Sequence, residues 1–150
     1  MTMNNVEEII DYAIEREQEA ADFYNKLAGV AESPGIKLAF TQYAQEEMGH
    51  KKKLQAVKEG KRLVPSHGKV IDLKISDYTV DVEFSEDMTY QQCLILAMKR
   101  EKAAFRLYMD LAAQTEDQEM KLTFAALAQE EAKHKLRFEV EYDEVILVEN

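Results

Sequence analysis

Residues Gln45–His50 read QEEMGH, and a closely similar stretch, QEEAKH, returns at Gln129–His134. Each stretch contains Glu-x-x-His, a spacing that on a helix places a carboxylate and an imidazole one turn apart on the same face. One copy is a weak signal, because exposed helices contain many glutamates and an occasional histidine. The chain has only three histidines, however, and two of them occupy this motif. The pair of motifs therefore predicts metal ligands.

The two motifs lie within an internal repeat. A shift of 84 residues aligns 12–54 with 96–138 without a gap, and 17 of the 43 aligned positions are identical. Chance similarity would give only a few matches, so the pattern indicates a duplicated helical hairpin. The identical pairs include Glu17 with Glu101, Tyr24 with Tyr108, Glu47 with Glu131, and His50 with His134.

Apolar residues recur at alternating steps of three and four, which is typical of bundle helices, and the predicted ligands interrupt these apolar faces. We predict one domain, 1–150, with helical hairpins over about 5–59 and about 86–144 and a connector over about 60–85. Helix starts are predicted at Pro34 after Ser33, at Ser85, and at a capping-box pattern over Thr115–Gln118. The apolar residues 145–148 can either finish the last helix or dock as a tail.

The connector is expected to be extended, with two alternating runs, Val70–Ile75 and Val80–Phe84, that can form strand. About 24 extended residues reach about 80 Å, whereas a helix of about 26 residues is about 39 Å long, so the connector can cross the whole bundle. The two hairpin turns would then lie at opposite ends, and all six predicted ligands would meet near the middle. The predicted fold is an all-α, antiparallel four-helix bundle with a long crossover between its second and third helices. His67, in the connector, is expected to be exposed.

Composition excludes several classes of function. Nineteen basic and 29 acidic residues give a net charge of −10, which argues against binding to nucleic acid or to an anionic membrane. No apolar run approaches the roughly 20 residues that span a bilayer, and the first residues lack the pattern of a signal peptide, so we expect a cytoplasmic protein. The single cysteine, Cys93, excludes a disulfide framework and is interpreted as a small core residue.

The predicted ligands are Glu17, Glu47, His50, Glu101, Glu131 and His134. Four carboxylates and two imidazoles would be strongly unfavourable in a bundle core without counter-charge. Two divalent cations would balance the four negative charges, and this mixture of ligands suits iron or manganese, with zinc as a further possibility. Glu46 and Glu130 also precede a histidine and compete for the assignment, but each lies about 100° around the helix from the inward position and is interpreted as a flanking residue.

These motifs resemble the rubrerythrin and ferritin-like di-iron carboxylate superfamily over most of the chain. The resemblance rests on the Glu-x-x-His motifs ending at His50 and His134 and on a tyrosine seven residues after each of Glu17 and Glu101. It implies a ferritin-like bundle with two iron ions. The implied roles are terminal ligands for Glu17 and Glu101, bridging ligands for Glu47 and Glu131, one metal each for His50 and His134, and carboxylate-bound hydroxyls for Tyr24 and Tyr108.

The chain departs from rubrerythrin in two respects. Rubrerythrins usually add a rubredoxin-like domain with four cysteines, for which this chain has neither the cysteines nor the length. They commonly place a further carboxylate three residues after the ligand in the third helix, where this chain has Ala104, just as Ala20 follows Glu17. The tyrosines can also be explained by core packing alone. No catalytic residue beyond the ligands is assigned.

The function expected from the resemblance is that of a di-iron oxidoreductase that reduces hydrogen peroxide or O2 in defence against oxidative stress. A separate protein would donate the electrons, and the chain is expected to form a homodimer. The first alternative is ferritin-like binding, storage or delivery of iron without turnover. The second is a structural bundle that keeps the motifs without using metal.

Overall fold

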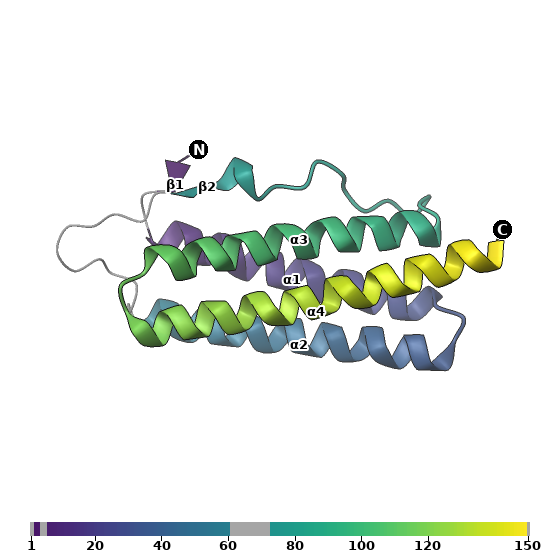
Figure 1. Ribbon diagram of the computed structural model, residues 1–150, viewed down its shortest axis with the longest axis horizontal. Helices are drawn as coiled ribbons and strands as arrows, with labels where there is room; N and C mark the ends of the chain where they lie inside the picture. The colour runs from purple at the N-terminus through teal and green to yellow at the C-terminus, as the bar shows by residue number, and fades with distance from the viewer. Residues whose placement is uncertain (1, 4–5, 61–72, 150) are drawn as a thin grey trace.

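The computed structural model describes residues 2–3, 6–60 and 73–149. Its four long helices lie side by side (Figure 1), and they are α1 (Val6–Val30), α2 (Pro34–Gly60), α3 (Tyr90–Gln114) and α4 (Gln118–Glu149). Helix α1 packs most extensively on α2, and α3 on α4. The turn that joins each pair lies at the opposite end of the bundle from the other (Figure 1). The predicted all-α, antiparallel bundle with a crossover is therefore confirmed.

The described part of the connector is docked on the bundle. Strand β1 (Thr2–Met3) pairs antiparallel with β2 (Leu73–Lys74), and a 3-10 turn, η1, follows at Ile75–Asp77. The chain then runs along α3 to the far end of the bundle (Figure 1). At the start of this run, directly after η1, the buried Tyr78 donates a hydrogen bond to the carboxylate of Asp110 in α3 and so attaches the connector to the bundle.

One detail of the predicted connector differs from the structure, and another cannot be compared with it. Val80–Phe84 forms no strand in the described structure, because this segment lies on side chains of the bundle and has no neighbouring strand with which to pair. His67 and residues 70–72 lie outside the described residues.

Helix α2 begins at Pro34 as predicted, but α3 begins later than Ser85. The Thr89 hydroxyl accepts a hydrogen bond from the Gln92 N–H, and the Gln92 side chain accepts one from the Thr89 N–H, which together form a capping box. The Ser85 hydroxyl instead accepts from the Asp87 N–H within a turn. Several residues in this stretch can act as caps, and the docked connector determines which one does.

The start of α4 also differs from its prediction. Asp117 Oδ1 accepts hydrogen bonds from the N–H groups of Glu119 and Met120, so Asp117 caps this helix. Thr115 is the C-cap of α3, and its hydroxyl accepts from the Asp117 N–H. The capping box predicted over Thr115–Gln118 is therefore wrong. Helix α4 continues to Glu149, so residues 145–148 finish the helix.

The apolar core is divided into two clusters, one toward each end of the bundle. The first contains residues such as Ile10, Leu54, Leu111 and Phe124, and the second contains residues such as Leu27, Phe40, Leu94 and Phe138. Cys93 is buried in the second cluster, as predicted. Between the clusters each helix contributes polar residues to the core. Within the described residues, none of the helices combines the length and apolarity needed to cross a membrane.

The assignment of Thr89, rather than Ser85, as the N-cap of α3 can be tested by substitution. Thr89→Ala should lower the free energy of unfolding by about 1 kcal/mol, because it leaves a helical N–H without its partner. Ser85→Ala, which removes a hydroxyl outside the helix, should lower the free energy of unfolding by only a few tenths of this value. Denaturant titration followed by circular dichroism measures both values. A larger loss for Ser85→Ala would contradict the assignment of the cap.

Candidate metal centre

All six predicted ligands lie in the polar layer between the two apolar clusters. Their exposed fractions do not exceed 5 %, and the six are Glu17, Glu47, His50, Glu101, Glu131 and His134. One glutamate comes from each of α1 and α3, and a glutamate and a histidine come from each of α2 and α4. The structure therefore brings together all six residues that were predicted because they interrupt the apolar faces of the helices.

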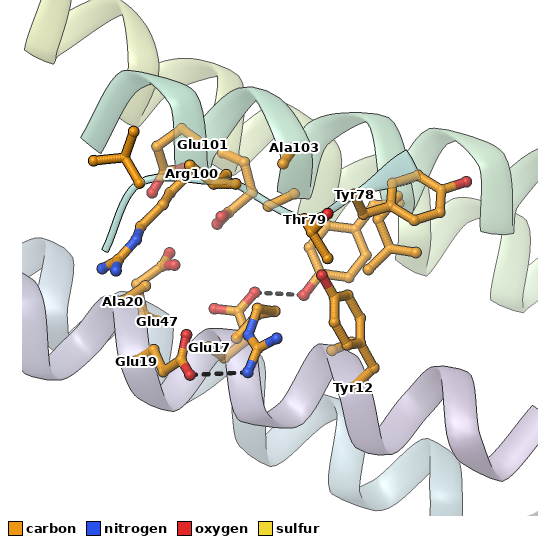
Figure 2. Close-up of a pocket in the computed structure, with 18 of the residues that line it drawn as sticks. Tyr12, Glu17, Glu19, Ala20, Glu47, Tyr78, Thr79, Arg100, Glu101 and Ala103 are labelled. Carbon is orange, nitrogen blue, oxygen red and sulfur yellow. Dashed lines mark hydrogen bonds and ion pairs between the residues drawn. The ribbon is translucent and has the colours of Figure 1, made fainter. Parts of the chain in front are cut away.

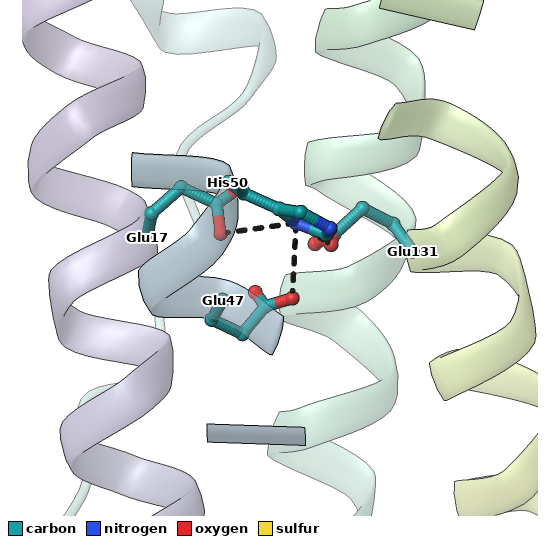
Figure 3. A group of neighbouring side chains, drawn as sticks. All are labelled: Glu17, Glu47, His50 and Glu131. Atoms are coloured by element: carbon teal, nitrogen blue, oxygen red, sulfur yellow. Dashed lines mark ion pairs between the residues drawn. The ribbon is translucent and has the colours of Figure 1, made fainter. Parts of the chain in front are cut away.

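One group of side chains gathers around His50 (Figure 3). Its Nδ1 lies 3.0 Å from Glu131 Oε1, 3.3 Å from Glu47 Oε1 and 3.5 Å from Glu17 Oε2. One ligand atom from each of these four residues lies within 4.8 Å of the others. This arrangement offers a single cation one imidazole nitrogen and three carboxylates.

A second group gathers around His134. Its Nδ1 lies 3.2 Å from Glu47 Oε1 and 3.8 Å from Glu101 Oε2, and Glu131 completes the set within the same 4.8 Å limit. The two groups share Glu47 and Glu131. Glu47 Oε1 lies almost equally far from the two Nδ1 atoms. The geometry thus provides two neighbouring cation positions with two carboxylates between them.

The two buried tyrosines connect the hairpins. Tyr24 in α1 donates its hydroxyl hydrogen to Glu101 Oε1 in α3, and Tyr108 in α3 donates to Glu17 Oε1 in α1. The predicted contacts of these tyrosines with the carboxylates of Glu17 and Glu101 are therefore observed, in addition to the packing of their rings in the core. Each contact leaves the second oxygen, Oε2, of its glutamate facing the site without a hydrogen-bond partner.

Burial controls the charge of the metal-free site. It raises the pKa of Glu17 to about 7 and of Glu131 to about 8, and it holds that of Glu101 well above the usual range, with a nearby carboxylate adding to each effect. For both histidines burial favours the neutral ring, but the surrounding carboxylates outweigh it and raise the pKa of His50 and of His134 to about 12. Without metal, the site therefore holds protons.

The donor atoms fit bound cations. Seven buried atoms of the site have no hydrogen-bond partner, because their close contacts lack hydrogen-bond geometry: Glu17 Oε2, Glu47 Oε1 and Oε2, His50 Nδ1, Glu101 Oε2, Glu131 Oε1 and His134 Nδ1. Buried polar atoms are almost always satisfied, so this concentration points to ligands that bind there. Carboxylate and imidazole donors suit iron and manganese.

A cavity of about 350 Å³ reaches the site from one side. It lies between α1 and α3 and beneath the connector residues 78–83 (Figure 2), and all four site glutamates contribute to its lining. Ala20 and Ala104 form part of its wall. Ala104 stands where rubrerythrins commonly have a further carboxylate, and Ala20 is its counterpart in the repeat. Their small side chains therefore leave open space beside the site. Sequence reasoning missed the role of residues 78–83, since only the fold shows where the connector docks.

The two flanking glutamates differ from each other. Glu130 is half-buried on α4, where its Oε1 lies 3.7 Å from Lys133 Nζ. Glu46 Oε2 lies 2.7 Å from His134 Nε2, the ring nitrogen that faces away from the site. Neither residue belongs to the two candidate ligand groups. Their interpretation as flanking residues agrees with this geometry, but the contact of Glu46 with His134 was not predicted.

Comparison with known protein families gives a match that includes the residues of this site. The model of the Rubrerythrin family matches residues 8–142, which include both Glu-x-x-His motifs and all six predicted ligands. The chain belongs to the Rubrerythrin family. Comparison with curated proteins and with solved structures gave no significant match. The resemblance stated from the motifs is thereby confirmed, and the buried glutamates and histidines fit the metal site that it implied.

The pKa shifts predict how pH acts on the metal-free protein. The pKa values of Glu17 and Glu131 rise from 4.5 on folding, and those of the histidines rise from 6.5. Between pH 4.5 and 8 the folded state therefore binds more of these protons than the unfolded state. The free energy of unfolding in a chelator should fall as the pH rises through this window, by about 1.4 kcal/mol per pH unit for each additional bound proton.

Metal should reverse this trend, because a cation competes with protons for the same atoms and binds more tightly at higher pH. Denaturant titrations at pH 5.5, 6.5 and 7.5, with chelator and with excess Mn(II), measure both slopes. A stability of the metal-free protein that increases with pH in this window would contradict the assigned shifts.

Proposed function

We propose that this Rubrerythrin-family chain is a di-iron carboxylate oxidoreductase that reduces hydrogen peroxide or O2. The proposal rests on one observation: two ligand groups that share Glu47 and Glu131 open onto a cavity. A storage site needs ligands, but a site that acts on a small oxidant also needs space beside them. About 350 Å³ is enough for such a molecule together with water.

The side chains have distinct roles in this proposal. Glu17 and Glu101 are terminal ligands that Tyr108 and Tyr24 hold in place, and the shared glutamates lie between the two cation positions. Two iron ions, when bound, supply the electrons that convert one hydrogen peroxide and two protons into two waters. A separate electron-donor protein restores them, since the single cysteine of this sequence cannot form a four-cysteine iron site. The walls of the cavity combine apolar side chains such as Val80 and Leu107 with charged ones such as Arg16 and Arg100.

Iron content and oxidant consumption test the proposal together. We expect anaerobic loading with Fe(II) to give two irons per chain and the reduced protein to consume hydrogen peroxide or O2. Glu47→Ala should bind less than one iron and lose this reaction, because it removes a ligand from both groups. Glu130→Ala, next to the other shared glutamate but outside both ligand groups, should behave as the wild type. Two bound irons without oxidant consumption would contradict the proposed activity.

The cavity provides a second test. Ala104→Leu should fill space beside the site and slow oxidant consumption severalfold, while two irons per chain are retained. Ala113→Leu adds the same bulk to an exposed position of α3 and is the matched control. Stopped-flow measurement of oxidant consumption, with iron analysis of both variants, distinguishes access from ligand loss. Equal rates for both variants would show that the oxidant does not use this cavity.

The same loading experiment addresses iron storage. Retention of many irons per chain, in a large hollow oligomer, would favour storage over turnover. The cytoplasmic location, the homodimer and the separate electron donor remain predictions.

A further inference from the structure

The two histidines of the site are not held alike. His134 contacts Glu46 across the interface of α2 and α4, with 2.7 Å between His134 Nε2 and Glu46 Oε2. The His134 side chain is 2 % exposed and that of Glu46 is 36 % exposed, so the carboxylate lies at the edge of the bundle and reaches inward. Because a carboxylate can only accept a hydrogen bond, Nε2 carries the hydrogen. When a cation displaces the Nδ1 proton of the metal-free site, the Nδ1 lone pair faces Glu47 and Glu101.

Two tyrosines add to this restraint on His134. The Tyr43 ring lies against the imidazole, with 4.3 Å between ring centroids and 34° between ring planes. Tyr24 meets the imidazole edge to face, at 6.2 Å and 88°. The hydrogen bond fixes one end of the imidazole, and the two aromatic rings restrict its rotation.

His50 lacks the corresponding contacts. In the duplicated sequence Glu130 corresponds to Glu46, but it is directed toward Lys133 at the surface, and in the described part of the chain no hydrogen bond or ion pair joins it to His50. The counterpart of Tyr43 is Leu127, which has no ring to stack. The repeat has therefore kept both ligands and has diverged around them.

We propose that Glu46 is a positioning residue that makes the cation position of His134 the tighter-binding of the two. A histidine held in its binding orientation loses less conformational freedom when metal binds, and a carboxylate on its outer nitrogen makes it a stronger donor. The group formed by Glu47, Glu101, Glu131 and His134 fills first, and the group around His50 fills second. This inference rests on the proposed metal site but not on the proposed reaction.

Titration with Co(II) tests the order of filling, because its visible absorption reports each newly formed site. Wild-type protein should bind two Co(II) ions in two unequal steps. Glu46→Ala should weaken the tighter step by about tenfold or more, the usual effect of losing a carboxylate behind a histidine ligand. Glu46→Gln, whose amide oxygen can still accept a hydrogen bond, should recover part of the affinity. Glu130→Ala, at the equivalent position of the repeat, should change neither step.

Further variants keep the test independent of the stability of Glu46→Ala. His134→Ala should remove the tighter step and leave the weaker one, whereas His50→Ala should do the opposite. Two equal steps in the wild type, or equal effects of Glu46→Ala and Glu130→Ala, would overturn this inference alone. Failure of the wild type to bind any Co(II), Fe(II) or Mn(II) would overturn both the inference and the proposed function.

Discussion

The cost of charge in the middle of the core constrains the whole structure. Each helix places carboxylate or imidazole side chains at the height where apolar residues would otherwise pack, so the core is split into two clusters. Burial opposes the charged form of these carboxyl groups and raises the pKa of Glu17 and of Glu131. Without metal, protons bound to these carboxyl and imidazole groups reduce the buried charge, whereas two divalent cations would balance four ionised carboxylates. The composition of this layer therefore fits bound divalent cations.

This constraint also explains how the two hairpins stay together. Helices α1 and α3 pack on each other far less than each packs on its own hairpin partner, and the cavity lies between them. Across this gap, Tyr24 donates to Glu101 and Tyr108 donates to Glu17. Each hairpin therefore supplies the hydroxyl that positions a carboxylate of the other. The connector covers the same opening, which accounts for its docking along α3.

The sequence predicted the helices and the meeting of the six candidate ligands in the core, because both depend on short-range periodicity. A glutamate or histidine in an otherwise apolar seam must point inward, and the duplicated hairpin showed the pattern twice. The starts of α3 and α4 were predicted less well, since serine, threonine and aspartate offered several caps within a few residues of Thr89 and Asp117. Packing in three dimensions, which periodicity does not describe, selected among them.

The contact of Glu46 with His134 shows a different limit of sequence reasoning. The angle around α2 correctly placed Glu46 beside the seam rather than in it. A glutamate side chain at the edge of a helix can still reach a histidine on the neighbouring helix, and its backbone position does not reveal that reach. The repeat could not predict this contact either, because the equivalent position also holds a glutamate, Glu130, which makes a different contact.

The two faces of the site have diverged to different extents. On the cavity side some duplicated positions are identical, since Arg16 matches Arg100 and Ala20 matches Ala104, but Glu19 and its counterpart Ala103, which also line the cavity, differ. Behind the histidines, Tyr43 and Leu127 differ. A molecule in the cavity therefore meets an arginine and an alanine from each hairpin, but the side chain of Glu19 from only one of them. In the proposed order of filling, the difference between the two positions arises on the opposite side of the site, through how firmly each histidine is held.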